Sequence, residues 1–386
     1  MIDLTRHHNV LRILAALDRG KAFLQKREGL RSMRKGEQNL DAFYAGVWRE
    51  AAAALGGKAD EVSHGVFDIR IDDFHTRVIG NTCDLDTLTT HIVVRTKPAV
   101  RRLLDRHGLP QTKYIPFAVD DMSPAIEFME KLGRDTVVKP ASGTGGGIGI
   151  TTGVRTRNHL ARASWAAARF GGDLTIEEQV EGDNYRLLFL DGKLIDAVLR
   201  LPPTVMGDGK SNILDLVKAE NERRASQGME VSHTQLTIDM DMTRTLERQG
   251  LSFSSVPEAG KTIAVKTAIN ENSANDNVTV MDKIAKATIE DAALAAKICG
   301  VRLAGVDLIL KDASVPLREG GGIILEVNSP PGYYWHYRKR DGCLPLGEIV
   351  LKQLIADHRN GRGPSISVSI HTGATQATPS FSEVCT

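Results

Sequence analysis

Residues 137–150 read VVKPASGTGGGIGI, and the interpretation of the whole chain starts from this stretch. Its apolar beginning predicts a strand that ends at Lys139, and five glycines follow within residues 140–149 before Ile150 resumes strand-like sequence. A loop with so few side chains can place its backbone N–H groups against phosphate oxygens, with the lysine as a counter-charge. The stretch therefore predicts a phosphate-binding hairpin, with a flexible connection as the alternative when the loop is taken alone.

The glycine loop differs from the two common glycine motifs. A P-loop requires GxxxxGK[ST], which does not occur in the sequence. A dinucleotide-binding turn requires a helix directly after the glycines, whereas a strand is predicted here. If the loop binds phosphate, it does so in another type of site.

Three oxygen-bearing side chains lie on two predicted strands further along the chain. Asp307 is part of GVDLIL at 305–310, and Glu326 and Asn328 are part of ILEVNSPPG at 324–332. Residues two apart on a strand face the same side, so Glu326 and Asn328 project together. Two carboxylates and an amide suit Mg²⁺, which is held by few carboxylates, by waters and by substrate phosphates. The alternative is the polar face of a half-exposed strand.

Two further signals are weak by themselves. Residues 175–182, TIEEQVEG, predict a strand that runs into a turn, where exposed backbone can hydrogen-bond a planar base. Lys97 stands at a predicted helix start, with Thr96 as the cap and Pro98 in the first turn. A lysine at such a place is more often a solvated surface residue.

An aromatic cluster follows the strand that carries Glu326. Tyr333, Tyr334 and Trp335 are consecutive in a chain with only 5% aromatic residues. Core packing is their expected role, with contact to a substrate as the alternative. The next residue, His336, is a candidate for a substrate pocket.

The rest of the chain predicts mixed α and β structure. Alternation in residues 66–78, and in residues 185–202 around the Asp191-Gly192 turn, predicts two hairpins. Helical spacing is found in residues 9–23, 42–55, 97–108, 123–133, 157–169, 212–224 and 283–298. Residues 226–280 have weak periodicity and give no assignment.

The composition limits the class of protein. A length of 386 residues allows two or three lobes with a large core. The 49 Lys and Arg against 48 Asp and Glu give a net charge of +1, so no global electrostatic reason exists for nucleic-acid or membrane binding. No apolar run is long enough to span a membrane. Four cysteines without a CxxC pair favour a reducing, cytoplasmic setting.

In combination, these features resemble the ATP-grasp superfamily of carboxylate-amine ligases. The order is a helix-start lysine, a strand lysine with a glycine loop, an EExV segment and then D…ExN, over about residues 96–334. Within the superfamily, residues 180–224 with GVDLIL and EVNSPPG look most like the ATP-grasp part of cyanophycin synthetase. The resemblance implies an α/β (α+β) ATP-grasp fold. Its parts would be a small N-terminal α/β lobe at 1–95, two ATP-clamping lobes at 96–182 and 183–360, and a disordered tail at 361–386.

The resemblance also implies a role for each matching residue. The nucleotide would be held by two lysines on its phosphates, a glycine lid over them, an adenine contact and a ribose contact, which are Lys97, Lys139, Gly143, Gly145, Gly146, Gly147, Glu177, Glu178, Val180 and Asp183. Mg²⁺ would be ligated by Asp307, Glu326 and Asn328. The catalytic residues would be the cations that face the transferring phosphate and the acyl substrate, which are Arg186, Arg200 and Lys210.

The sequence departs from its relatives at two places. D-alanine ligases carry an arginine two residues before the metal-binding aspartate, where this chain has Gly305. The oxyanion role is then expected to fall elsewhere, with Arg200 as the candidate. Cyanophycin synthetase also continues into a second ligase module with its own P-loop. Because no such motif occurs here, we do not expect the chain to make cyanophycin by itself.

The expected function is ATP- and Mg²⁺-dependent ligation of an acid to an amine, both amino acids or peptides, through an acylphosphate. An ATP-dependent carboxylate or small-molecule kinase is one alternative, because it needs the same site. A non-catalytic nucleotide-binding regulatory protein is the other, although it predicts loss of a lysine or a metal ligand. The expected partners are small-molecule substrates, without nucleic acid or membrane, and the resemblance is compatible with a homodimer.

Overall fold

The computed structural model describes residues 40–141, 148–226 and 235–362 of the chain. The predicted helix at 9–23, the glycines at 143–147 and the tail beyond 362 lie outside these residues. The described part contains mixed α and β structure in several sheets, all of whose strand pairs are antiparallel.

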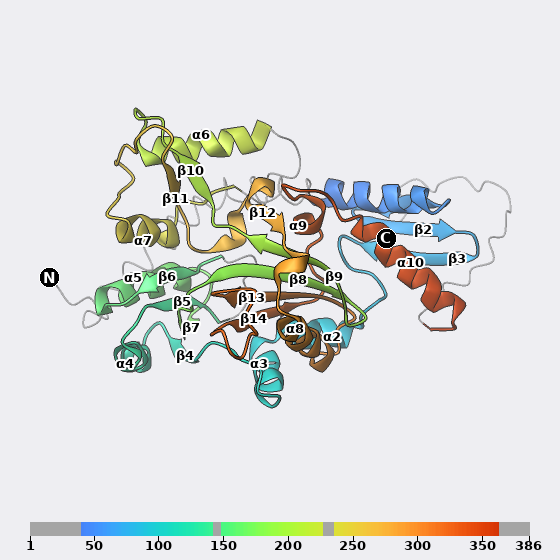
Figure 1. Ribbon diagram of the computed structural model, residues 1–386, viewed down its shortest axis with the longest axis horizontal. Coiled ribbons are helices and arrows are strands. Elements are labelled where there is room, and N and C mark those ends of the chain that lie inside the picture. Colours follow the sequence, from blue (N-terminus) through green and yellow to red (C-terminus); the bar gives the residue numbers. More distant parts are fainter. Residues whose placement is uncertain (1–39, 142–147, 227–234, 363–386) are drawn as a thin grey trace, which may run out of the picture.

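The largest sheet has five strands. In spatial order they are β12 (Asn277–Thr279), β9 (Lys193–Arg200), β8 (Asp183–Leu190), β13 (Leu303–Leu310) and β14 (Ile323–Asn328). The predicted Asp191-Gly192 turn joins β8 to β9, with φ of 50° and 77° at the two residues, as a tight two-residue hairpin requires. One face packs its apolar side chains against α8 (Lys286–Ile298), which lies along the sheet in Figure 1. The opposite face carries Arg186, Asp307 and Glu326 in one part and Leu188, Leu190 and Leu303, which belong to another core, in the next.

A second sheet has four strands. In spatial order they are β4 (Tyr114–Ala118), β7 (Asp173–Glu178), β5 (Thr136–Pro140) and β6 (Thr151–Val154). The helices α4 (Ser123–Leu132) and α5 (Arg157–Ala168) share its apolar core. The strand ending at the glycine loop and the strand that resumes after it are therefore neighbours, as the sequence predicts, since Val138 pairs with Thr151.

The first described helix, residues 40–54, covers a three-stranded sheet of β1 (Lys58–Ser63), β2 (Val66–Ile71) and β3 (Phe74–Ile79). Its core also contains Tyr333 and residues of α10 (Leu346–Arg359), which come from the other end of the described chain. Tyr333 is fully buried and packs edge to face against Tyr44 and Trp48, so core packing, the expected role, describes this aromatic residue.

A small lobe occupies part of the region that the sequence left unassigned. It contains β10 (Thr204–Met206) paired with β11 (Thr262–Ala264), together with α6 (Ile213–Ser226) and α7 (Met240–Arg248). These elements share a core of their own, in which Ile213, Met242 and Ile263 are buried. Figure 1 shows this lobe beside the four-stranded sheet, with α7 next to β6.

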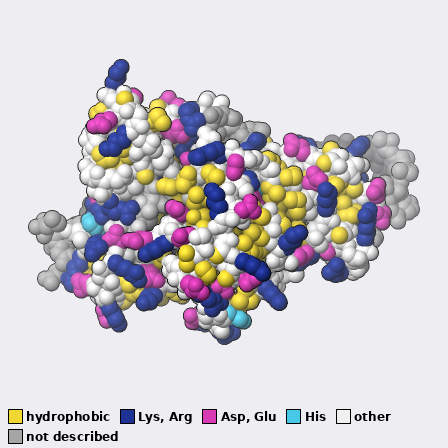
Figure 2. All heavy atoms as spheres, viewed as in Figure 1, with side chains coloured by type: hydrophobic (Ala, Val, Ile, Leu, Met, Phe, Trp, Pro, Cys, Tyr) yellow, Lys and Arg dark blue, Asp and Glu magenta, His cyan; other side chains and the backbone are white. Residues whose placement is uncertain are grey.

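The remaining elements are short. They are α2 (Leu88–Arg95), α3 (Lys97–Asp105), α9 (Tyr334–Tyr337), η3 (Ile269–Glu271), η4 (Ala274–Asp276) and η5 (Met281–Lys283). The predicted cap at Thr96 is wrong in one respect, because its hydroxyl donates backwards to the Ile92 carbonyl of α2 at 2.8 Å. Figure 2 shows both signs of charge interspersed over one face of the molecule, in keeping with the net charge of +1. None of the helices in the described residues combines the length and the apolar character that a membrane crossing requires.

Candidate active site

Asp307, Glu326 and Asn328 come together on the polar face of the five-stranded sheet. Asp307 on β13 lies opposite Glu326 on β14, and Asn328 donates from Nδ2 to Asp307 Oδ2 at 3.0 Å. Alternation along the two strands sends Val306 and Val327 into the core on the other face. The structure thus brings together the three side chains that the sequence singled out as metal ligands.

The chemistry of these donors fits Mg²⁺. Within the described residues, no group of three or more His, Cys, Asp and Glu side chains is placed to hold a metal ion. The candidate set of Asp307, Glu326 and Asn328 consists of two carboxylates and one amide. Mg²⁺ bound by such a set takes its remaining ligands from water and from substrate phosphates. Glu326 suits this role because its side chain is 41% exposed and the nearby Lys97 Nζ lies 3.8 Å from its carboxylate.

Arg186 occupies the space that a side chain at position 305 would need. It lies opposite Asp307 on the neighbouring strand β8 and donates from Nε and Nη2 to both Asp307 oxygens, the second bond measuring 2.8 Å. A Cβ built on Gly305 would stand 3.0 Å from Arg186 Nη1 and 3.1 Å from Pro331 Cβ. The glycine thus lets an arginine from the next strand reach the buried aspartate.

Arg200, the candidate for the oxyanion role, lies on the same face at the end of β9. Its Nη2 donates to the Ile269 carbonyl at 2.7 Å, and its Nη1 lies 4.0 Å from Asp307 Oδ1. Its guanidinium also stacks over Trp335, 5.0 Å from the ring centroid. Arg200 Nε is buried and has no hydrogen-bond partner among the described residues, so it is an unsatisfied donor inside this cluster.

The two predicted phosphate lysines approach the polar face of the five-stranded sheet from outside that sheet. Lys139 comes from β5 of the four-stranded sheet, and Lys97 comes from α3. Lys139 on β5 has a side chain that is 13% exposed and pairs with Glu177 on β7, with 2.8 Å between Nζ and Oε1. Arg101 of α3 pairs with the same carboxylate. Lys97 lies near enough for its charge to act on Lys139 and Glu177, in each case in the direction that lowers the pKa. Lys97 therefore lies between the Lys139–Glu177 pair and Glu326.

The predicted adenine segment, residues 177–180, begins with two carboxylates that already have partners within the protein. Glu177 is held by Lys139 and Arg101, and Glu178 accepts from the backbone N–H of Lys113 at 2.9 Å and from Arg134 at 2.5 Å. A base at this place would have to meet the backbone of the following residues rather than these side chains.

The chain leaves this segment through Val180 and Gly182 to reach Asp183, the predicted ribose contact. Gly182 has a φ of 141°, and a Cβ there would lie 2.5 Å from the Leu310 carbonyl oxygen. A cavity of about 290 Å³ opens at this point. Its lining includes Gly182, Asp183, Pro202, Thr245, Arg248 and Ile269. Asp183 is exposed and borders this cavity.

Two groups of predicted residues are not joined to the cluster. Lys210 is exposed in the turn before α6, where its backbone N–H donates to Asp208 at 2.8 Å. Gly143, Gly145, Gly146 and Gly147 lie outside the described residues. The roles of these residues stay predictions.

Sequence reasoning missed Arg101, Asp196 and Lys339. Arg101 follows Lys97 by four residues on one helix, which places both on the same face, and this spacing could have revealed it. Asp196 accepts from the candidate pocket residue His336, at 2.8 Å from Nδ1, and from Lys339 Nζ at 3.0 Å. The partners of Asp196 lie far from it in sequence, so no local pattern predicts these contacts.

Burial and charge act in opposite directions on the two central carboxyl groups. Burial favours the neutral form of Glu177, but Lys139 and Arg101 outweigh it and hold its pKa below the ordinary 4.5. Burial likewise opposes ionisation of Asp307, but Arg186 and Arg200 hold its pKa below the ordinary 3.8. Burial also lowers the pKa of Arg200 to about 10, so the guanidinium stays charged at neutral pH.

These pKa directions predict how stability depends on acid. Because the carboxyl groups of Glu177 and Asp307 have a lower pKa in the folded than in the unfolded chain, the unfolded state takes up protons first as the pH falls. Their contribution is complete above about pH 5 and is lost as the pH falls below about 4. Urea unfolding between pH 7 and pH 3 measures this loss. Glu177→Gln should show a shallower acid dependence than the parent, and an equal slope would contradict the assignment.

The close approach at Gly305 predicts that even one methyl group is unfavourable. Gly305→Ala should lower the free energy of unfolding by about 1 kcal/mol or more, because Arg186 or Pro331 must shift. Gly46→Ala is the matched control, since nothing lies within 4 Å of a Cβ there and Ala favours the helix by about 0.5–1 kcal/mol. Denaturant unfolding of both variants checks the prediction, which fails if Gly305→Ala is as stable as the control.

Two antiparallel sheets that meet at a cluster of cations and carboxylates define the class of fold: the chain has the ATP-grasp fold. The bifunctional glutathione synthetase of Pasteurella multocida has a similar fold, with a TM-score of 0.52 and 23% sequence identity. The match covers 80% of this chain and 44% of that chain. The predicted fold is thereby confirmed.

The sequence is similar to that of cyanophycin synthetases. The cyanophycin synthetase of Trichormus variabilis is 32% identical over 287 residues, which are 73% of this chain and 31% of that protein. The glutathione biosynthesis bifunctional protein GshAB of Mannheimia succiniciproducens is 26% identical over 250 residues, or 64% of this chain and 33% of that protein. The chain thus spans about a third of the length of these curated relatives. No protein-family model matches the chain.

Proposed function

We propose that the chain is an ATP- and Mg²⁺-dependent ligase that joins a carboxylic acid to an amine through an acylphosphate. The observation that carries the proposal is the meeting of two sets of charges from different sheets. Lys139 with Glu177 belongs to the four-stranded sheet, Asp307 and Glu326 belong to the five-stranded sheet, and Lys97 stands 3.8 Å from Glu326 between them. The phosphate oxygens of a triphosphate need cations beside them, and its metal ion needs carboxylates. A site for both therefore contains the two kinds of charge side by side.

Each group has a place in the proposed reaction. Lys97 and Lys139 would hold the phosphate oxygens of ATP, with the nucleoside towards the cavity beside Asp183. Asp307, Glu326 and Asn328 would hold Mg²⁺, which offsets negative charge on phosphoryl oxygens when bound. Arg186 keeps Asp307 ionised and oriented through its two hydrogen bonds.

The acid would bind on the Arg200 side of the cluster. A carboxylate oxygen of the acid attacks the γ-phosphorus of ATP, the bond to the β–γ bridging oxygen breaks, and ADP leaves. An amine then attacks the acyl carbon, phosphate leaves with the bonding electron pair, and the amine loses a proton. The Arg200 guanidinium, whose Nη1 lies 4.0 Å from Asp307 Oδ1, would offer positive charge to the oxygen that gains charge on the acyl carbon.

The substrates are proposed to be amino acids or peptides. The support is the similarity to cyanophycin synthetase and to the glutathione biosynthesis protein, both named for products or pathways of that kind. A cytoplasmic location and a homodimer also stay proposals. Light scattering of the purified chain tests the homodimer.

A phosphate-release screen tests the function. Pairs of amino acids and peptides are supplied with ATP and Mg²⁺, and the products are identified by mass spectrometry. The proposal requires an amide product, ADP release that depends on the amine, and loss of both when EDTA removes the metal. ADP release that needs only the acid would indicate the kinase alternative. Nucleotide binding without turnover on any pair would favour the regulatory alternative.

A further inference from the structure

Asp241, near the start of α7, joins two segments that are distant in sequence. Its side chain is fully buried, and its two oxygens accept four hydrogen bonds. Oδ1 accepts from the backbone N–H and the hydroxyl of Thr152, at 3.0 and 2.7 Å. Oδ2 accepts from the backbone N–H groups of Thr267 and Ala268, at 3.1 and 2.9 Å. We call this set of contacts the Asp241 bridge.

One end of the Asp241 bridge is the edge of the four-stranded sheet. Thr152 lies on β6, the neighbour of β5, which carries Lys139. The same edge is held again one residue later, because Arg244 of α7 donates to the Gly153 carbonyl at 2.9 Å. The position of this sheet relative to α7 is therefore fixed by side chains of α7.

The other end of the bridge is the segment that holds Arg200. Ala268 is followed by Ile269, whose carbonyl accepts from Arg200 Nη2 at 2.7 Å. The same segment is anchored by Lys266, which is buried and pairs with Asp239 at 2.7 Å and with Glu271 at 2.9 Å. A displacement of Ala268 would therefore be transmitted to the carbonyl on which the Arg200 guanidinium rests.

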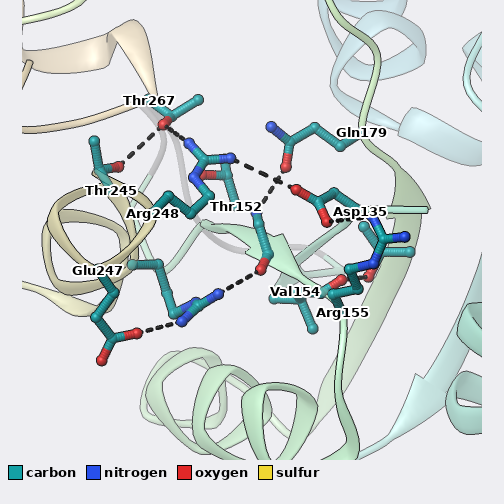
Figure 3. A network of polar contacts seen from close by, with 12 residues as sticks. Asp135, Thr152, Val154, Arg155, Gln179, Thr245, Glu247, Arg248 and Thr267 are labelled. Atoms are coloured by element: carbon teal, nitrogen blue, oxygen red, sulfur yellow. Dashed lines mark hydrogen bonds and ion pairs between the residues drawn. The ribbon is translucent and has the colours of Figure 1, made fainter. Parts of the chain in front are cut away.

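Figure 3 shows further polar contacts beside Thr152 and Thr267, two of the residues that donate to Asp241. Arg248, at the end of α7, donates to the Thr267 hydroxyl at 2.5 Å and lies 3.9 Å from Asp135, the residue before β5. Gln179, after β7, accepts from the Gly153 N–H at 2.6 Å. These contacts join α7 to residues beside β5, β6 and β7 and to Thr267 after β11, so the bridge is part of a joint between the four-stranded sheet and the small lobe.

We propose that Asp241 is a positioning residue: it sets the place of the sheet that carries Lys139 relative to the carbonyl that holds Arg200. The inference rests on the proposed ligase function, in which Lys139 meets the phosphates and Arg200 meets the acid. Each ligand can bind to its own lobe without the bridge. Transfer between the ligands requires both lobes at one fixed spacing, and misplacement of about 1 Å can cost about 100-fold in rate.

Asp241→Asn tests the proposal. Asn has the size of Asp, but its NH2 group cannot accept, so either the two donors of Thr152 or the N–H groups of Thr267 and Ala268 lose their acceptor. We expect kcat per bound nucleotide to fall about 10–100-fold. The Kd for ATP measured alone should stay within about twofold, since Lys139 and its partners are unchanged. Loss of folded protein alone would lower the bound fraction without lowering the rate per bound nucleotide.

Two variants control for folding and for charge. Asp215→Asn removes one negative charge from α6 of the same lobe, where Asp215 forms an exposed pair with Lys218, and should keep kcat within about twofold. Thr152→Val keeps the shape of the side chain and removes only the hydroxyl donor, so it tests the bridge if Asp241→Asn does not fold. It should lower kcat about 3–10-fold, in line with one charged hydrogen bond. Unchanged rates in Asp241→Asn or Thr152→Val, or an equal loss in Asp215→Asn, overturn the proposal.

A second readout separates this proposal from the proposed function. Arg200 stacks over Trp335, so release of the Ile269 segment should change the emission of Trp335. We expect Asp241→Asn to differ from the parent in acrylamide quenching, and the difference to vanish when both carry Trp335→Phe. If the parent makes no amide product, the proposed function fails while this signal still tests the bridge. Identical quenching in the two proteins contradicts it.

Discussion

A chain that carries Glu326→Gln is expected to fold like the parent and to lose about 10²–10³-fold in kcat. Gln keeps the size of the side chain but removes one of two charges that would bind Mg²⁺, and loss of a metal ligand is worth several kcal/mol in the transition state. Stability should hardly change, because the Glu326 side chain is 41% exposed and its 3.8 Å contact with Lys97 is a weak surface pair.

The matched control for this change is Glu290→Gln on α8. Glu290 is also exposed and also faces one lysine, with Lys286 Nζ at 3.7 Å. Rates at saturating ATP over a range of Mg²⁺ concentrations, together with denaturant unfolding, check both variants. The metal assignment of Glu326 is wrong if its variant keeps kcat within tenfold of the control at every Mg²⁺ concentration.

Arg186→Met is expected to lower the free energy of unfolding by about 3 kcal/mol and to abolish activity, because it leaves the buried Asp307 without its main partner. Arg200 at 4.0 Å offsets part of this loss. In the variant, the Asp307 carboxylate is a charge with too few hydrogen bonds. Its pKa, which Arg186 helps to hold low in the parent, should therefore rise.

The double variant Arg186→Met with Asp307→Asn separates lost packing from unpaired charge. Removal of the carboxylate charge should recover about half of the lost stability, since replacing both members of a buried pair costs less than removing one. Urea unfolding of the parent, the two single variants and the double variant gives the coupling between the two sites. Purely additive losses would show that the pair is not coupled.

The local parts of the fold could be predicted from the sequence. Turn chemistry at Asp191-Gly192 and the stop at Gly133 act within a few residues, and all three of these residues have positive φ in the structure. Alternation placed Glu326 and Asn328 on one face because a strand has a fixed period. These features depend on neighbours in the chain, which a sequence shows directly.

The rest depends on pairs of residues that are far apart in sequence. The segment after β11 is held by Asp241 and Lys266, which are buried polar groups and give no apolar period. Arg186 reaches the space above Gly305 only because β8 and β13 pair in one particular register. A register between strands more than a hundred residues apart cannot be deduced from either strand alone.

The core shared by the three-stranded sheet, Tyr333 and α10 has a consequence for biosynthesis. Trp48, Phe67 and Ile69 leave the ribosome early, whereas Leu346, Val350 and Leu351, which bury them, are translated near the end of the described chain. Until then, the part of this core that α10 completes stays uncovered in the nascent polypeptide, although the helix at 40–54 already packs there, and it can attract other hydrophobic surfaces. Chaperone dependence during translation should therefore concentrate on this sheet, and shortening the chain before α10 should send the product into inclusion bodies rather than leave a trimmed enzyme.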